Sequence, residues 1–312
     1  MRKLLLSLLI IMLSLSVIGC GSSNSGAGEE VVINIGVMPD VESIPFIVAQ
    51  DKGFFEQEGV KVNIEHFSSA KDRDSALQSG KLDGVITDIL AVLFANEGGI
   101  DLRIISVTDG NIELMAGPDS SIKSMVELKG KDLGLSTNTI MEYSADKMLV
   151  AGGLDPREVN KVAIPPLPTR LEMLQGGKVQ AAILPQPLAG LAVKNGARVL
   201  GSTDDLGQKA GAIAFTAQVL RDNPQKIEAV FRAYNRAVDY LNTQATGADL
   251  DFIIDEQGFP AGIKDSIQLP QYQLATAPDQ VVFMDVVNWM IEKDLIKEVY
   301  AYEDVVDKTV LQ

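Results

Sequence analysis

The chain has 312 residues, 27 of them basic and 42 acidic, which gives a net charge of −15. This length is enough for two domains, each with a core of its own. The negative charge argues against a nucleic-acid partner, because binding phosphates needs a basic surface. One cysteine excludes an internal disulfide, a cysteine-rich zinc site and an iron–sulfur cluster, and one histidine excludes His-His metal motifs. We therefore expect no metal, no cofactor and no enzyme activity.

The N-terminus has the pattern of an export signal. Arg2 and Lys3 precede a run of apolar residues and serine over residues 4–18, which is shorter than the ~20 apolar residues that span a bilayer. The run ends in VIGC at residues 17–20, which resembles the lipobox of bacterial lipoproteins. The resemblance implies cleavage before Cys20 and a diacylglycerol on its sulfur. The alternative is an ordinary secretory signal with an incidental cysteine.

These features predict where the protein resides. We expect a lipoprotein signal peptide over residues 1–19 and a flexible tether over residues 20–30, which are rich in glycine and serine. Two or more acyl chains would hold the protein stably on the extracytoplasmic face of the cell membrane, either the outer surface of a monoderm or the periplasm. No later segment approaches ~18 uninterrupted apolar residues, so we expect no other membrane span.

From residue 31 the chain repeats a short apolar strand, a polar turn and an amphipathic helix. Strands are predicted over residues 31–38, 60–66, 84–87, 102–107, 133–136, 161–165, 181–184 and 198–201. Helices are predicted over residues 43–52, 71–79 and 89–96, each followed within two residues by glycine. Alternating strands and helices favour an α/β fold with parallel sheets covered by helices on both faces.

The last hundred residues are predicted to be helical. Asn223 and Pro224 begin one helix, and Trp289 lies in another. Their apolar side chains recur at helical spacing, so we assign them to the core rather than to a ligand site. These side chains are Ile227, Val230, Phe231, Tyr234, Val238 and Leu241 in the first helix and Val282, Val286, Trp289 and Met290 in the second.

Polar residues occupy the turns where predicted strands pass into helices. In open α/β sheets such turns lie at the carboxyl ends of the strands, where ligands bind beside helix N-termini. Taken singly, each turn is explained by helix capping, and Thr139 with Glu142 and Thr169 with Glu172 have the spacing of a capping box. Taken together, they predict a ligand crevice. The turns are residues 39–43, 67–69, 87–88, 136–139 and 166–169.

Several segments in a common order resemble the SsuA/THI5-like (NMT1-type) substrate-binding proteins of ABC importers. They are residues 35–37 (IGV), 44–60 (IPFIVAQDKGFFEQEGV), 77–84 (LQSGKLDG), 128–131 (LKGK), 151–156 (AGGLDP), 171–182 (LEMLQGGKVQAA) and Trp289. The resemblance covers nearly all of the chain after residue 30. It implies a type II periplasmic-binding-protein fold, in which two α/β lobes flank a central cleft and are joined by two crossover strands.

The resemblance also implies lobe boundaries and a ligand site. Lobe one would comprise residues 31–110 and 215–312 and lobe two residues 111–214, with crossovers near residues 112–117 and 212–216. Binding would close the lobes, and an ABC permease with its ATPase would recognise the closed form of a monomeric protein. The implied ligand-binding residues are Asp40, Ser43, Ile44, Phe67, Ser68, Thr87, Asp88, Thr108, Asn138, Thr139, Leu167, Pro185 and Gln186.

Carboxylates crowd the implied site. Asp40, Glu42 and Asp88 lie at the rim of one lobe, and Glu142 lies in the first turn of a helix. Unless they are salt-bridged, these charges disfavour a small anion and favour a neutral or donor-rich organic ligand. The cationic side chains that could neutralise some of them are Arg73, Arg103 and Arg170.

The sequence therefore predicts an extracytoplasmic protein that captures a small organic nutrient of the sulfonate, nitrate, taurine or pyrimidine-precursor class. One alternative is an enzyme of related fold, either pyrimidine-synthase-like or dehydratase-like. The former branch depends on a cysteine cluster and a histidine, whereas the lone His66 here is predicted at a strand edge or, alternatively, stacked on the ligand. Another alternative is a surface sensor or adhesin lipoprotein.

Overall fold

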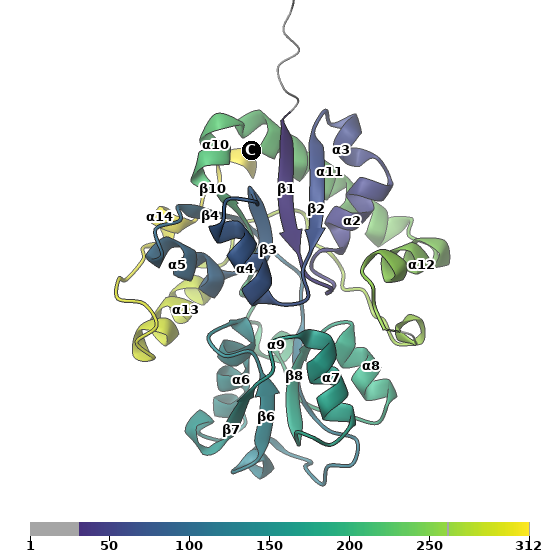
Figure 1. Ribbon diagram of the computed structural model, residues 1–312, viewed down its shortest axis with the longest axis vertical. Helices are drawn as coiled ribbons and strands as arrows, with labels where there is room; N and C mark the ends of the chain where they lie inside the picture. The colour runs from purple at the N-terminus through teal and green to yellow at the C-terminus, as the bar shows by residue number, and fades with distance from the viewer. Residues whose placement is uncertain (1–30, 261, 312) are drawn as a thin grey trace, which may run out of the picture. The chain divides into compact units, whose positions relative to one another are not determined.

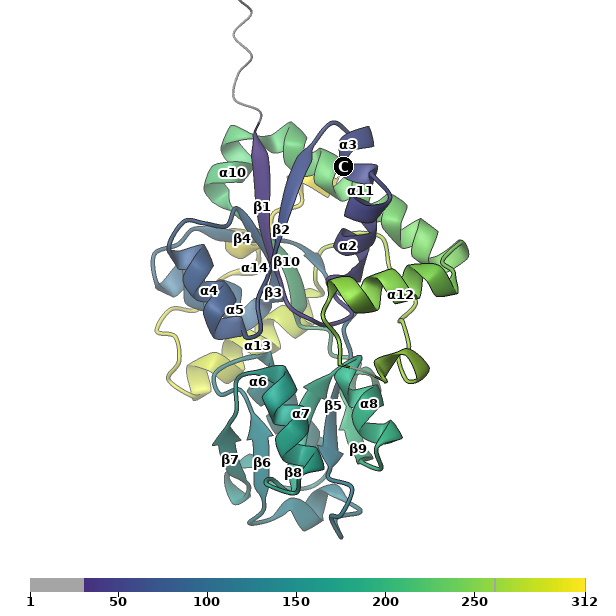
Figure 2. The same ribbon diagram turned by 45° about the vertical axis from the view of Figure 1, so that its right-hand side comes forward.

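The computed structural model describes residues 31–260 and 262–311 (Figures 1 and 2). The expected signal peptide, the tether and Cys20 lie outside these residues. Within the described chain the strands form two five-stranded sheets, in the orders β2-β1-β3-β10-β4 and β7-β6-β8-β5-β9. The first sheet contains β1 (Val32–Val37), β2 (Lys61–His66), β3 (Gly84–Asp88), β4 (Leu102–Val107) and β10 (Gly211–Thr216). The second contains β5 (Ile112–Ala116), β6 (Asp132–Leu135), β7 (Asn160–Ala163), β8 (Ala181–Pro185) and β9 (Arg198–Ser202).

The helices divide between the two sheets (Figure 1). With the first sheet are α2 (Ile44–Asp51), α3 (Phe54–Gln57), α4 (Ala70–Gln78), α5 (Ile89–Glu97), α10 (Ala217–Asp222), α11 (Pro224–Thr243), α12 (Gly247–Glu256), α13 (Gln280–Glu292) and α14 (Tyr302–Val305). With the second are α6 (Ile140–Ala151), α7 (Leu167–Gln175), α8 (Leu188–Lys194) and α9 (Thr203–Leu206). Short 3₁₀ turns are η1 (Met125–Leu128), η2 (Pro156–Glu158), η3 (Ile263–Asp265) and η4 (Thr309–Leu311).

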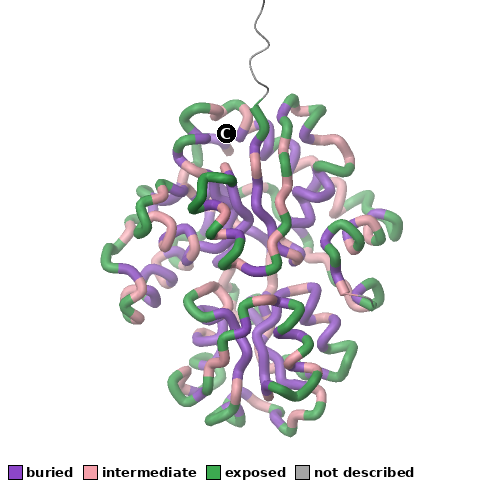
Figure 3. The backbone as a smooth tube through the Cα atoms, in the orientation of Figure 1, coloured by how far each residue is buried: buried purple, intermediate pink, exposed green. Residues whose placement is uncertain are grey.

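Strand β10 shows how the first sheet forms a core on both faces. Its residues alternate between two apolar clusters, with Ile213 and Phe215 in one and Ala212 and Ala214 in the other, as the two-residue repeat of a strand requires. On the first face, Phe215 packs against Phe231 of α11 with ring centroids 5.9 Å apart. On the second face lie α5 and α13. Buried residues are concentrated in the central strands of both sheets, such as β3 and β8 (Figure 3).

The strands and helices predicted with residue ranges are confirmed to within one or two residues at each end. The last hundred residues are helical only in part, because residues 266–279 and 293–301 form no helix. The predicted capping boxes are not confirmed. Thr139 caps α6, but the Glu142 carboxylate accepts from the N–H of Asn138, 2.7 Å away, rather than from the cap. Thr169 lies inside α7, which begins at Leu167 because Pro168 suits a helical first turn. A complete capping box is formed instead by Thr246 and Asp249 at the start of α12.

The two sheets are built from matching units. In the first sheet, Arg73 of α4 donates from Nη1 to Ile86 O of β3 at 2.9 Å, and in the second sheet Arg170 of α7 donates from Nη1 to Ile183 O of β8 at 2.9 Å. Each carbonyl lies 13 residues after its arginine. After each arginine the chain reads LQSGK or LQGGK at the same spacing, over residues 77–81 and 174–178. The similarity extends to strand order, with the one antiparallel strand, β10 or β5, in fourth place.

The chain passes between the sheets twice. It leaves the first sheet after β4 and enters the second at β5, and it returns through α9 to β10. Residues 211–214 pair with β3 and β4 in the first sheet, so the expected boundary at residue 215 is a few residues too late. The reason is that β10 completes the first sheet before the chain reaches the C-terminal helices.

Candidate ligand-binding site

A cavity lies where the strands of both sheets end and their helices begin. Its volume is about 40 Å³, which accommodates only a few water molecules. An organic solute would therefore enter only when the walls move apart. The cavity is lined by Met38, Asp40, Glu42, Ala70, Arg73, Ile86, Thr87 and Asp88 from the first sheet and its helices, and by Ser136, Thr139, Ile140, Met141, Pro165 and Leu167 from the second.

Five of the residues implied by the resemblance line this cavity, namely Asp40, Thr87, Asp88, Thr139 and Leu167. Thr87 and Asp88 end β3, whereas Asp40, Thr139 and Leu167 follow β1, β6 and β7. Asp88 and Thr139 also cap α5 and α6 by accepting from Ala91 N–H and Met141 N–H.

The other implied residues lie outside the cavity lining. Ile44 is fully buried in the core of the first lobe, Phe67 is half-buried, and Ser68 and Asn138 are exposed. Pro185 belongs to β8.

Three further residues implied by the resemblance form hydrogen bonds within the protein. Ser43 Oγ donates to Met38 O at 2.9 Å, and Thr108 donates to Glu42 Oε1. The side-chain amide of Gln186 donates to Glu113 Oε1 at 3.0 Å and accepts from Gly190 N–H at 3.2 Å.

Apart from Leu167, the lining residues without a polar group were not among the residues that the sequence predicted. They are Met38, Ala70, Ile86, Ile140, Met141 and Pro165. Each lies next to or within a few residues of a predicted turn. Ser136 lay inside one of those turns but was not singled out.

Three carboxyl groups line the first-lobe wall, with Asp40 and Asp88 buried and Glu42 half-buried. Burial raises the pKa of Asp40 to about 7 and that of Asp88 to about 6, because a charged carboxylate loses its hydration. Burial, together with the neighbouring charge of Asp40, raises the pKa of Glu42 to about 8. Three acids with pKa values near neutral pH therefore lie beside one another in the cavity.

Each lobe also contributes a buried arginine. Arg73 lines the cavity, and its Nε donates to Asp74 at 2.9 Å. Arg170 is fully buried behind Ser136 and donates to the carbonyl oxygens of Ile164, Pro165 and Ile183 as well as to Ser136 Oγ. Burial lowers the pKa of Arg170 to about 9. Its hydrogen bonds fix the backbone that forms the second-lobe wall.

Glu42 lies where the two crossings of the chain meet. A Cβ atom added at Gly110, between β4 and β5, or at Gly211, at the start of β10, would collide with the Glu42 carboxyl group. Next to Glu42, the N–H of Val41 donates to Gln186 O of the second lobe at 3.2 Å. One cavity carboxyl group is therefore in contact with both segments that join the lobes.

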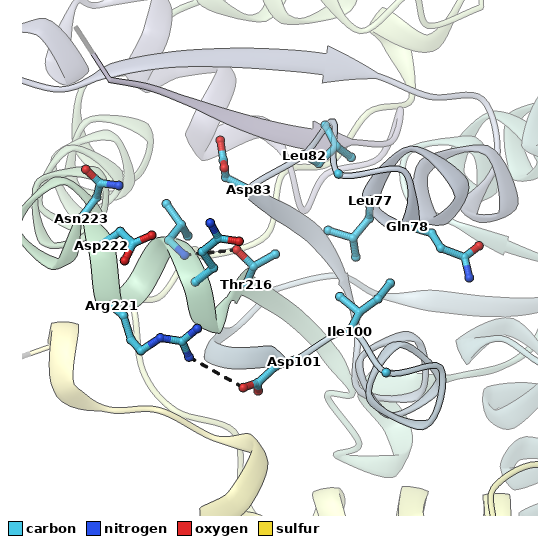
Figure 4. A pocket seen from close by; sticks show the side chains of 14 residues that line it. Leu77, Gln78, Leu82, Asp83, Ile100, Asp101, Thr216, Arg221, Asp222 and Asn223 are labelled. Atoms are coloured by element: carbon cyan, nitrogen blue, oxygen red, sulfur yellow. Dashed lines mark hydrogen bonds and ion pairs between the residues drawn. The ribbon is translucent and has the colours of Figure 1, made fainter. Parts of the chain in front are cut away.

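A larger hollow of about 540 Å³ lies at the opposite end of β3 (Figure 4). It is lined by first-lobe residues alone, among them Leu77, Asp83, Asp101, Thr216 and Arg221. Arg221 lies 3.9 Å from Asp101. Because no second-lobe residue lines this hollow, closure of the lobes would not enclose a ligand there.

His66 ends the edge strand β2, and its Nε2 atom lies 3.7 Å from Glu256 Oε1. It does not line the cavity. In the described part of the chain, no three His, Cys, Asp or Glu side chains are arranged to hold a metal ion. Among the helices of residues 31–260 and 262–311, none is long and apolar enough to cross a bilayer.

Comparison with known proteins shows the family to which the chain belongs. The NMT1/THI5-like family model matches residues 40–246. The chain belongs to this family. It is 24% identical over 256 residues to a putative ABC transporter periplasmic binding protein of Brachyspira hyodysenteriae, covering 77% of this chain and 74% of the relative. It is also 24% identical over 250 residues to a putative aliphatic sulfonates-binding protein of Bacillus subtilis, covering 76% and 74%.

Solved structures confirm the fold of this family member. The alkanesulfonate-binding protein SsuA from Xanthomonas axonopodis pv. citri, bound to MOPS, has a TM-score of 0.75 at 17% identity and covers 90% of this chain and 99% of its own. The expected fold class, two α/β lobes of the periplasmic-binding-protein type, is therefore confirmed. The desulfurization enzyme DSZB shares the fold with a TM-score of 0.64 at 14% identity, covering 90% and 97%, so the fold alone does not separate binding proteins from enzymes.

Proposed function

We propose that this protein is the solute-binding component of an ABC importer and that it captures a small organic nutrient between its lobes. The observation that carries the proposal is the cavity, because its walls come from the carboxyl ends of strands in both sheets and are joined by two chain crossings. Membership of the NMT1/THI5-like family and the names of the two curated relatives support it.

The proposed cycle follows from the size of the cavity. The lobes part to admit the solute, close on it by bending at the crossings near Gly110 and Gly211, and present the closed form to a permease and its ATPase. The lobe assignment that goes with this cycle is residues 31–110 and 211–312 for the first lobe and 111–210 for the second. The remaining implied residues, such as Asn138 and Phe67, would reach the solute only in a more open arrangement.

We further propose that the protein works as a monomer anchored by lipid at Cys20 on the extracytoplasmic face of the membrane. The lipobox-like VIGC sequence supports this part of the proposal, and two or more acyl chains are sufficient for stable attachment. Replacing Cys20 with alanine should release the protein from the membrane fraction. Retention of the Cys20→Ala variant in that fraction would contradict the anchor but leave the solute-binding function standing.

The solute-binding function is tested by thermal unfolding with a panel of small organic nutrients, combined with mass spectrometry of solute retained by freshly purified protein. A solute present at ~100 times its Kd stabilises the folded state by about 2.7 kcal/mol, which raises the Tm of a protein of this size by several degrees. No shift with any compound and no retained solute would argue against the function. Recovery of a chemically altered solute would instead support the enzyme alternative that the DSZB fold leaves open.

A further inference from the structure

The two walls of the cavity differ in charge. The first-lobe wall carries Asp40, Glu42 and Asp88 with one cation, Arg73. The second-lobe wall consists of uncharged side chains, two of them hydroxyls and four of them apolar: Ser136, Thr139, Ile140, Met141, Pro165 and Leu167. A solute that fits both walls has a polar end that faces carboxylates and an apolar end that faces the second lobe.

The charge of Arg73 lowers the pKa of all three carboxylates, but Arg73 forms no ion pair with any of them. Asp40 accepts from the N–H groups of Glu42 and Ser43, Asp88 accepts from Ala91 N–H, and Glu42 accepts from the Thr108 hydroxyl. No ion pair within 4 Å reaches any of these three carboxylates from another described residue, Arg73 included. The guanidinium of Arg73 is directed instead at Ile86 O and at Asp74.

A second observation points to a missing partner at the same wall. Thr87 lines the cavity and is only 5% exposed, yet its hydroxyl has no hydrogen-bond partner among the described residues. A buried hydroxyl left in this way costs free energy. A donor group on the solute would satisfy it, whereas Arg73 Nη2 on the same wall, which also makes no hydrogen bond and lies 2.8 Å from Asp74 Oδ1, would take an acceptor.

We infer that the solute is a small organic cation whose protonated amine binds Asp40, Glu42, Asp88 and the Thr87 hydroxyl, while its apolar part contacts the second-lobe wall. This inference rests on the proposed function and names the ligand class of the same site. Burial already disfavours the charged form of the three acids, so an ammonium group supplies the opposite charge that restores it.

The lining also distinguishes between kinds of cation. Quaternary ammonium groups are typically recognised by faces of aromatic rings, and none of the described residues that line the cavity is aromatic. An ammonium group with N–H bonds suits this site because carboxylate and hydroxyl oxygens accept hydrogen bonds. Sulfonate or nitrate would be repelled by those of the three acids that are ionised.

The test uses matched sets of compounds that share a carbon skeleton, each set containing a primary amine, its trimethylammonium analogue and its sulfonate, with nitrate added. Binding is measured by thermal shift and then by calorimetry, and any retained solute is labelled with an amine-reactive reagent before mass spectrometry. We expect a primary amine, added or retained, to bind at least tenfold more tightly than its sulfonate and trimethylammonium analogues. Stronger binding of a sulfonate or nitrate, or no binding of any amine, would overturn the inference.

Matched variants test the geometry. Asp88→Asn keeps the cap on α5, because asparagine is also a good N-cap, and should weaken amine binding at least tenfold. Asp83→Asn, just before the opposite end of the same strand and bonded to Asn34, should bind within twofold of the parent. Equal affinities for the two variants would place the amine elsewhere. Binding of a sulfonate or nitrate would overturn only the ligand class. If no compound binds and no solute is retained, the proposed function is overturned as well.

Discussion

At the scale of single residues, burial acts in opposite directions on the two kinds of charged side chain around the cavity. It raises the pKa of Glu42 to about 8 and lowers the pKa of Arg170 to about 9, because in both cases the charged form loses hydration. The difference lies in their partners. Arg170 has four oxygen acceptors around its guanidinium, whereas Glu42 lies among carboxylates.

The raised pKa of Glu42 predicts that the protein loses stability as the pH rises. Its pKa in the unfolded chain is ordinary, about 4.3, so between that value and about 8 the folded state holds a proton that the unfolded state has released. Stability then falls with rising pH through this window, to which Asp40 and Asp88 also contribute. Glu42→Gln cannot ionise and should flatten the fall.

The measurement is the Tm at pH 5.5, 7 and 8.5 without solute, since each kcal/mol moves the Tm of a domain of 150–250 residues by about 2–4 °C. Glu303→Gln, on the exposed surface of α14, serves as the control and should follow the parent. A Glu42→Gln variant with the same dependence on pH as the parent would show that Glu42 is already ionised at pH 5.5.

Arg170 predicts a large loss of stability on truncation. Arg170→Ala would leave two buried backbone carbonyls, those of Ile164 and Ile183, and the part-buried carbonyl of Pro165 without this donor and would open a cavity in a fully buried site. Each unsatisfied group costs about 1–3 kcal/mol, so we expect a loss of about 3–5 kcal/mol in urea denaturation. The control is Arg157→Ala, because that side chain is 89% exposed. A loss below 1 kcal/mol for Arg170→Ala would mean that water replaces the guanidinium.

At the scale of elements, the sequence predicts strand–turn–helix units well because their signals are local. The apolar run GVIT followed by Asp88 specifies both the end of β3 and the cap of α5. Thr169 shows the limit of such signals, because the spacing of a capping box was present but α7, with Pro168 in its first turn, starts three residues earlier than that box requires. Competing local signals are decided by backbone geometry that spacing alone does not encode.

From the sequence, the ligand site could be located only to a set of turns between strands and helices. The sequence does not show which side chain of a turn faces the cavity, and neighbours behave differently. Glu42 faces the cavity, whereas Ser43 turns to Met38 O and to Gln257, which is 214 residues away in the chain. Long-range partners of this kind leave no mark in a local pattern, so Ser43 was expected to bind the ligand and Glu42 only to crowd its rim.

Strand β10 predicts a strict requirement for glycine at the second crossing. A Cβ atom at Gly211 would collide with the Thr108 hydroxyl and the Glu42 carboxyl group. We expect Gly211→Ala to destabilise the protein by about 1–3 kcal/mol in urea denaturation, as overpacking does, and to weaken solute binding by displacing Glu42. Gly247→Ala, where nothing lies within 4 Å, should be neutral or slightly stabilising. Equal urea midpoints for Gly211→Ala and Gly247→Ala would mean that the Glu42 side chain makes room for the added methyl group without loss of stability.

At the scale of the whole described chain, a second set of contacts joins the lobes away from the cavity. Helix α13 of the C-terminal segment packs with the first sheet and bonds to α6 of the second lobe. Asp285 accepts from Tyr143 Oη at 2.6 Å and from Lys147 Nζ at 2.7 Å. Lys293 lies 2.7 Å from Glu142 and 2.9 Å from Asp146. The arrangement of the lobes therefore depends on these polar contacts as well as on the two crossings.

These contacts predict that the resting balance between closed and open arrangements can be shifted without touching the solute site. Asp285→Ala removes a charged hydrogen bond to Tyr143, a type worth about 1.5–3 kcal/mol, and a half-exposed ion pair worth less. A change of 1–2 kcal/mol alters an equilibrium by a factor of about 5–30, so the variant should populate open forms and bind solute more weakly by a similar factor.

Small-angle X-ray scattering should show a larger radius of gyration without solute and recovery of the parent value at saturation. Glu228→Ala on α11 is the control, because no described contact joins Glu228 to the second lobe. An unchanged radius and Kd in Asp285→Ala would mean that the crossings alone hold the lobes together.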